Sequence, residues 1–179
     1  MRIIGIDPGS RATGYGIVDL DGASPRHVAH GVVRVSASLP IASRLASIHG
    51  SLVEVVSEFK PSCAVIERVF VSNNPQSAIV LGEARGVALA ALASAGLAVE
   101  EISAREVKQA VTGNGGATKQ DVQAMVSRLL GLEPAPPSDA SDALAIAICR
   151  SREGRLAGLG VRRGRRRPRR LADLTRSQR

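Results

Sequence analysis

The chain opens with a short apolar run that ends in an acid and a forced turn, Ile3 to Ser10. Its branched residues predict a buried strand, and Pro8-Gly9 makes the chain turn directly after Asp7. Glycines and apolar residues alternate from residue 11 to 19, as in the return strand of a hairpin. We therefore expect Asp7 at the rim of a central strand, on rigid backbone. An ordinary Asp-Pro-Gly turn is the alternative.

Length and composition favour one domain with an aliphatic core. The chain has 179 residues, of which 44% are hydrophobic and only 2% aromatic. Asp7 interrupts the first apolar run, so no secretory signal is expected. The apolar segment Gly86 to Val99 is short for a membrane span, and we predict a soluble, cytoplasmic protein. Cys63 and Cys149 lack metal-binding spacing and are expected as reduced thiols.

The positive charge is concentrated at the C-terminal end. The last 30 residues hold twelve arginines and two acids, a net charge of +10, which leaves −2 for residues 1–149 out of a total of +8. We predict a folded domain over residues 1–152 and an Arg-rich, largely disordered tail over 153–179. The tail either adds salt-sensitive affinity for phosphates or is a solvated segment with no dedicated role, and the sequence leaves both open.

The next segments predict a third strand, a helix and a second strand that ends in an acid. His27 and His30 lie three apart in the strand near residues 26–35, which predicts opposite faces and no shared metal. Apolar spacing predicts a helix over 41–59. Four apolar residues then precede Glu67, as in a buried central strand.

The loop after Glu67 carries Phe70, which either packs beneath the loop or points outward to stack on a base. A long helix is predicted over 76–95, with Glu83 and Arg85 facing solvent. Its second half is apolar on all sides, which favours packing on a second subunit. A strand near 97–102 leads into a capping box at Ser103 and a helix that carries Lys108.

Residues 113–119 are rich in glycine but lack the spacing of a phosphate-binding loop. We expect Thr118 to cap the next helix, with Asp121 at its third position, and Lys119 to be available for an external anion. The last helix opens with Asp139 and Asp142 on one face of its first turn. These two acids alone could also be ordinary capping residues.

Four carboxylates thus lie where rigid elements are expected to begin or end: Asp7, Glu67, Asp139 and Asp142. If they converge, their mutual repulsion needs cations. All-oxygen ligands favour Mg²⁺ or Mn²⁺, and a pair of such ions about 3.5 to 4 Å apart is the usual device for phosphodiester cleavage. The hypothesis is a two-metal nuclease.

The chain resembles the RuvC family of bacterial Holliday junction resolvases, in the ribonuclease H-like superfamily. The resemblance covers about residues 1 to 150 and rests on G-I-D-P-G-S-R-A-T-G-Y-G, A-V-I-E-R-V-F-V-S-N-N, G-E-A-R-G-V-A, A-R-E-V-K-Q and S-D-A-S-D-A-L-A-I-A. It implies an α/β fold with a five-stranded mixed sheet flanked by helices, a homodimer, and paired symmetric nicks in four-way DNA junctions. No motif of the family matches the Arg-rich end.

The resemblance also implies roles for particular residues. Asp7, Glu67, Asp139 and Asp142 would be catalytic and bind two Mg²⁺ per subunit, with Mn²⁺ able to substitute. Phe70, Lys108 and Lys119 would contact DNA, and RuvA and RuvB would be partners.

Two other classes of protein stay open. A sugar kinase or actin-like ATPase also begins with strand, Asp and Gly but needs a second domain. A non-catalytic junction-binding protein would not need four convergent acids.

Overall fold

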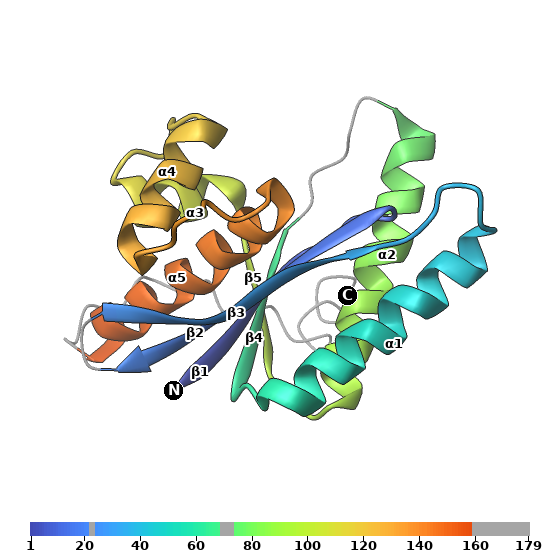
Figure 1. Ribbon diagram of the computed structural model, residues 1–179, viewed down its shortest axis with the longest axis horizontal. Helices are drawn as coiled ribbons and strands as arrows, with labels where there is room; N and C mark the ends of the chain where they lie inside the picture. Colours follow the sequence, from blue (N-terminus) through green and yellow to red (C-terminus); the bar gives the residue numbers. More distant parts are fainter. Residues whose placement is uncertain (22–23, 69–73, 159–179) are drawn as a thin grey trace, which may run out of the picture.

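Five strands form one mixed sheet in the order β3-β2-β1-β4-β5 (Figure 1). The structure is a computed structural model that describes residues 1–21, 24–68 and 74–158. The antiparallel part comprises β1 (Arg2–Asp7), β2 (Ala12–Asp21) and β3 (Ser24–Arg34). The strands β4 (Cys63–Glu67) and β5 (Val99–Ile102) continue the sheet in parallel with β1. The predicted five-stranded α/β fold is confirmed.

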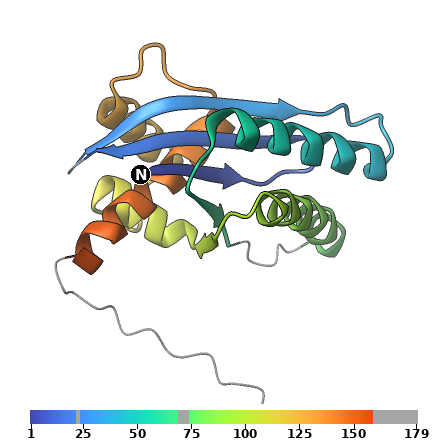
Figure 2. The same cartoon turned by 90° about the horizontal axis from the view of Figure 1, so that it is seen from below.

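Helices cover both faces of the sheet (Figures 1 and 2). One face packs against α1 (Ile41–Phe59) and α2 (Pro75–Ser94). The other packs against α3 (Ala104–Thr112), α4 (Lys119–Leu130) and α5 (Ser138–Gly158). The predicted boundary at residue 152 lies within α5, and the division into a domain and a tail stays a prediction. Most of the Arg-rich tail lies outside the described residues.

Alternation along β1 and β4 decides which side chains meet which helices. Ile3 and Val65 pack on the α5 side, whereas Ile4 and Ile66 pack on the side of α1 and α2. Successive side chains of a strand point to opposite faces. Because this alternation continues to the end of each strand, Asp7 and Glu67 also lie on the α5 side.

Glycine lets α5 lie directly on the first two strands. A Cβ at Gly5 would stand 2.2 Å from the carbonyl oxygen of Ala143, and one at Gly14 would stand 2.0 Å from that of Asp139. At Gly16 it would stand 2.6 Å from the backbone nitrogen of Leu144. The helix backbone therefore occupies the space of three missing side chains, which holds the start of α5 beside the end of β1.

The helix ends follow the predicted capping chemistry. Thr118 accepts a hydrogen bond from the amide of Asp121, whose carboxylate accepts one from the amide of Thr118. The same reciprocal pair forms between Ser103 and Glu106 at the start of α3. These caps fix the first turns of α3 and α4.

The predicted placement of the two histidines on opposite faces is wrong. His27 Nε2 and His30 Nδ1 lie 2.8 Å apart in a hydrogen bond, so both side chains lie on one face. The register of β3 against β2 shifts between Ile17 and Val18, because Val28 is an extra residue without a partner on β2. A bulge of this kind reverses the alternation of faces. Burial and the neighbouring ring lower the pKa of His27.

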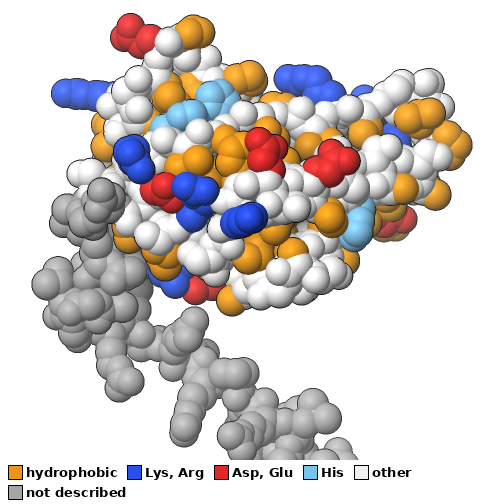
Figure 3. All heavy atoms as spheres, turned by 60° about the horizontal axis from the view of Figure 1, so that its bottom comes forward, with side chains coloured by type: hydrophobic (Ala, Val, Ile, Leu, Met, Phe, Trp, Pro, Cys, Tyr) orange, Lys and Arg blue, Asp and Glu red, His pale blue; other side chains and the backbone are white. Residues whose placement is uncertain are grey.

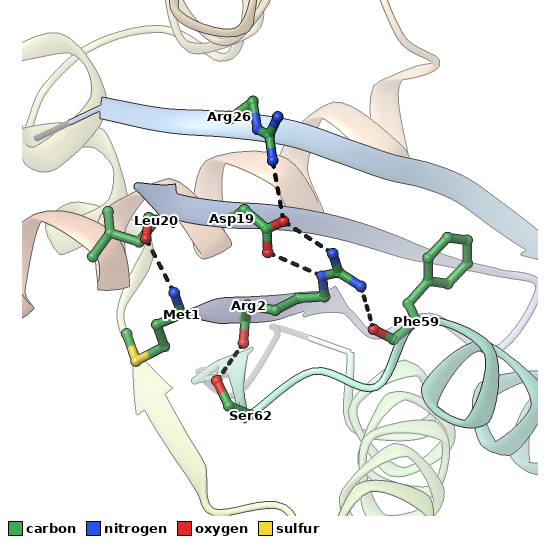
Figure 4. A network of polar contacts seen from close by, with 7 residues as sticks. All are labelled: Met1, Arg2, Asp19, Leu20, Arg26, Phe59 and Ser62. Atoms are coloured by element: carbon green, nitrogen blue, oxygen red, sulfur yellow. Dashed lines mark hydrogen bonds and ion pairs between the residues drawn. The ribbon is translucent and has the colours of Figure 1, made fainter. Parts of the chain in front are cut away.

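A polar network ties the first strand to its neighbours at the end of the sheet away from Asp7 (Figure 4). Arg2 donates two hydrogen bonds of 2.9 Å to Asp19 on β2 and one of 2.7 Å to the carbonyl oxygen of Phe59. Ser62 donates to the carbonyl oxygen of Arg2 at 2.8 Å. The network joins β1, β2 and the connection from α1 to β4, and hydrogen bonding to Arg2 lowers the pKa of Asp19.

The surface has mixed charge and one long apolar helix. On the face drawn in Figure 3, Lys and Arg side chains lie beside Asp and Glu side chains. Among the described helices, α2 is long and apolar enough, by length and composition alone, to cross a membrane. One of its sides is buried in the core through Ala84, Ala88 and Leu92, and Ile79 is exposed.

Candidate active site

Two of the four predicted acids lie side by side where neighbouring parallel strands end. Asp7 is the last residue of β1 and Glu67 the last of β4. The strands are in register up to the pair Ile6 and Ile66, so the two acids follow at the same level. The carboxyl ends of parallel strands meet at one edge of a sheet, where side chains from different strands can act together.

The other two acids reach this edge from α5. Asp7 pairs with Gly14 across β1 and β2, and Gly14 is the position where a Cβ would collide with the backbone of Asp139. Asp142 lies three residues further along, on the same side of the helix. Three elements therefore supply the four carboxylates, as the sequence predicted.

The pKa values show that these acids share one environment. The pKa of Asp7 is raised from 3.8 to about 7, first by burial and then by the charges of Asp142, Glu67 and Asp139. Burial, followed by the charge of Asp142, also raises the pKa of Glu67. The site holds more negative charge than its own groups neutralise.

Of the three predicted DNA contacts, two lysines lie near the acids. Lys119 Nζ forms an ion pair of 2.5 Å with Asp142 Oδ2, although the sequence predicted only an external anion for it. The hydrogen bond to Asp142 raises the pKa of Lys119. The charge of Lys108, on α3, opposes part of the rise that burial and Asp142 cause in the pKa of Glu67. Phe70 lies outside the described residues.

Sequence reasoning placed Arg85 wrongly, and the structure gives it a supporting contact. We expected its side chain in solvent, but Arg85 Nε donates to the carbonyl oxygen of Glu67 at 3.2 Å. Its Nη2 pairs with Glu101 Oε2 at 2.8 Å. Arg85 thus fastens the end of β4 to α2. Its place in the G-E-A-R-G motif was the available signal, but the helical pattern alone did not show which way it points.

The donor set fits a hard divalent cation. All four side chains offer carboxylate oxygens, the ligands that Mg²⁺ and Mn²⁺ prefer. Burial, and after it the charge of neighbouring acids, raises the pKa values of Asp7 and Glu67, so a bound cation would favour their ionised forms. Within residues 1–21, 24–68 and 74–158, no three His, Cys, Asp or Glu side chains are arranged closely enough to form a metal-binding group by themselves.

The sheet order and the acids at its edge define a nuclease of the ribonuclease H-like class. The chain belongs to the RuvC family, because a profile described as "Crossover junction endodeoxyribonuclease RuvC" matches residues 3–150. The enzyme of that name from Marinobacter nauticus is 51% identical over 147 residues, which are 82% of this chain and 83% of the relative. The one from Neisseria meningitidis serogroup A is 48% identical over 172 residues, 92% and 97% of the two chains.

A solved structure supports the same assignment. T. thermophilus RuvC in complex with a Holliday junction substrate is 37% identical to this chain and superimposes with a TM-score of 0.82. The match covers 90% of this chain and 97% of that one. The likeness therefore extends over nearly all of both proteins.

Proposed function

We propose that this protein resolves four-way DNA junctions by paired symmetric nicks, in recombination and DNA repair. The observation that carries the proposal is the convergence of four carboxylates from β1, β4 and α5 at one edge of the sheet. The bound junction in the structure of the T. thermophilus relative supports the substrate class.

Asp7, Glu67, Asp139 and Asp142 are the proposed ligands of two Mg²⁺ ions per subunit, with Mn²⁺ able to substitute. Held by these acids, such ions would supply Lewis-acid chemistry at the attacking water and at the leaving oxygen of the phosphodiester. Asp7 is the proposed central ligand, because it ends the central strand β1, with Glu67 at the same level on β4 and the backbone of Asp139 against its cross-strand partner Gly14. No protein nucleophile is needed.

The cationic and aromatic residues are assigned to DNA. Lys119 and Lys108 lie close enough to the acids to affect their pKa values, which suits contacts with phosphates near the scissile bond. Phe70 is the proposed stacking residue, since a base on an aromatic ring gains about 1 to 3 kcal/mol. These three residues would position the strand rather than react with it.

A symmetric pair of nicks calls for two sites, and we propose a homodimer. Exposed apolar residues of α2, such as Ile79 with 58% of its surface exposed, support this helix as part of the interface. RuvA and RuvB, which the family resemblance implies, are the proposed partners, and the cytoplasm is the proposed compartment.

Incubation of the protein and Mg²⁺ with a synthetic four-way junction or a linear duplex of the same sequence tests the function. We expect nicks at symmetric positions of the junction, little cutting of the duplex, and no cutting by Asp7→Asn. Junction binding without cleavage by the unmodified protein would favour a non-catalytic junction-binding protein. Equal cutting of both substrates would contradict the junction selectivity.

A further inference from the structure

A cavity of about 450 Å³ lies at the end of the sheet where β1 ends in Asp7, in a place that the mechanism above does not use. Its walls are the turn between β1 and β2, the first turn of α1, and the first two turns of α2. Polar lining comes from Ser10, Arg11, Arg44, Gln76 and Ser77. Because Ser10 and Arg11 follow Asp7 directly in the chain, the cavity opens at the same end of the sheet, on the side of α1 and α2.

The cavity is positively charged. Arg11 and Arg44 are its charged lining residues, and none of the lining side chains is a carboxylate. Among the described residues neither arginine has an acidic partner within ion-pair distance. Arg2 and Arg150, by contrast, each lie beside a carboxylate, that of Asp19 and that of Glu100. Two unpaired guanidinium groups at one cavity favour an anionic ligand.

The hydrogen bonds of Arg44 point to the same ligand. Its Nη1 donates to the carbonyl oxygen of Ser10 at 3.2 Å, which fixes the guanidinium against the turn. Its Nε is buried and has no hydrogen-bond partner within the described part of the chain. The charge of this guanidinium has no acidic partner among the residues that the structure describes, and an anion bound in the cavity would offset it.

The frame around the cavity is held by short contacts. Thr13 Oγ1 donates to the carbonyl oxygen of Gly9 at 2.8 Å, and the amide of Val35 donates to that of Arg11 at 3.0 Å. The side chain of Asn74 already accepts from the amides of Gln76 and Ser77. Since these amides of α2 are engaged, an anion would depend on the two arginines and not on the helix terminus.

We propose that this cavity, here called the arginine cavity, binds one backbone phosphate of the DNA strand that is cut. The proposal rests on the function proposed above. A strand laid across this end of the sheet would place its scissile phosphate over Asp7 and a neighbouring phosphate between Arg11 and Arg44. The contact is independent of sequence, and both arginines act as positioning residues.

Junctions that carry a single neutral methylphosphonate linkage, moved stepwise on either side of the nick, test the assignment. Binding is measured with the full-length protein in EDTA, so cleavage does not enter. The unmodified protein is expected to lose about tenfold in affinity at one linkage, because a charge-assisted contact is removed. Arg44→Gln and Arg11→Gln should each bind the junction without a neutral linkage about tenfold more weakly than the unmodified protein does. Making the sensitive linkage neutral should then lower the affinity of these variants little further.

Arg26→Gln is the matched control. Arg26 is exposed, and it lies at the opposite end of the sheet because it pairs in register with Asp19, opposite Arg2. This variant loses the same charge and should keep the methylphosphonate profile of the unmodified protein. Arg44→Lys, which retains the charge, should recover part of the affinity and guards against a folding defect, with the melting temperature measured for every variant.

Two results would overturn the proposal. In the first, Arg44→Gln and Arg11→Gln lose as much affinity as the unmodified protein when the sensitive linkage is made neutral, which would place that phosphate elsewhere. Alternatively, excess inorganic phosphate could raise the melting temperature through the arginines while the DNA profile stays unchanged, which would make the cavity a site for a free anion. Failure of the proposed function would appear separately, as a junction that the unmodified protein binds but does not nick in Mg²⁺.

Discussion

Lys119 Nζ lies 2.5 Å from Asp142 Oδ2, so a side-chain cation neutralises one of the four acids. The lysine is largely exposed, with 56% of its side chain accessible. It comes from the capped first turn of α4, whereas Asp142 belongs to α5. A divalent cation bound at the proposed site would therefore compete with Lys119 for Asp142, and the displaced ammonium would become available to a DNA phosphate.

Removal of this lysine should strengthen metal binding and weaken DNA binding. For Lys119→Met we expect Mn²⁺ to bind up to about fivefold more tightly in the absence of DNA, because an exposed ion pair contributes about 0.2 to 1 kcal/mol. Junction affinity should fall. Calorimetric titration with Mn²⁺ measures the first effect. Weaker Mn²⁺ binding by this variant would show that the lysine supports the metal site instead of competing for it.

The raised pKa of Asp7 makes the metal-free protein less stable as the pH rises. Between about pH 4 and pH 7 the folded protein keeps a proton on Asp7 that the unfolded chain has lost, so the free energy of unfolding decreases with pH. Above pH 7 the cost reaches up to about 4 kcal/mol. Asp7→Asn should remove it and be more stable than the unmodified protein at pH 8 in EDTA.

Urea unfolding at pH 5 and pH 8 measures this difference. Glu54→Gln, an exposed acid on α1, is the control and should follow the unmodified protein at both pH values. Glu67 contributes in the same direction, because its pKa is also raised, so some pH dependence should survive in Asp7→Asn. An unchanged difference between the two pH values in Asp7→Asn would contradict the assignment.

The close approach at Gly14 predicts a coupled loss of stability and activity. In Gly14→Ala the new Cβ would meet the backbone of Asp139, so α5 must move away from β2. We expect a loss of about 1 to 3 kcal/mol in unfolding free energy and slower cleavage, because two acids move with the helix. Gly50→Ala, in the middle of α1 with open space around it, should gain about 0.5 to 1 kcal/mol and cut normally. A Gly14→Ala variant with full activity would show that α5 need not lie so close.

Arg85 should matter for cleavage although it does not reach the acids' side chains. A lysine in Arg85→Lys cannot contact the carbonyl oxygen of Glu67 and the carboxylate of Glu101 at the same time with two separate nitrogens, as Arg85 does. We therefore expect about 10- to 100-fold slower cleavage. Arg68→Lys is the matched control, since Arg68 is exposed and only approaches Glu101 at 3.8 Å. If both variants slow cleavage equally, the loss would come from the contacts of Arg68 and Arg85 with Glu101 and not from the hydrogen bond between Arg85 and the carbonyl oxygen of Glu67.

The positions of the predicted acids could be read from the sequence because rigid elements fix where their last residues lie. A buried strand that ends in Asp7 or Glu67 leaves the acid at the edge of the sheet, whatever the details of packing. The bounds of α1 and the two capping boxes were predictable for the same reason, since local apolar spacing and cap chemistry determine them.

Contacts between distant segments were less predictable. The bulge at Val28 that joins His27 to His30 has no local signature, because it depends on how β3 aligns with β2. Arg85 turns toward Glu67 and Lys119 toward Asp142 only once α2, α4 and α5 have packed. Local pattern fixes the position of a residue on its element but not the partner that the fold brings to it.

Single-turnover cleavage of a four-way junction tests most directly whether the four acids act as one site. The rates are measured for four single variants and one double variant: Asp7→Asn, Glu67→Gln, Asp139→Asn, Asp142→Asn, and Asp7→Asn combined with Asp142→Asn. Residues that act as a unit show strongly non-additive losses. We predict that each single change lowers the rate by at least about a thousandfold and that the double change is no worse than either single change. A near-normal rate for any single variant, or losses that multiply in the double variant, would contradict a shared metal site.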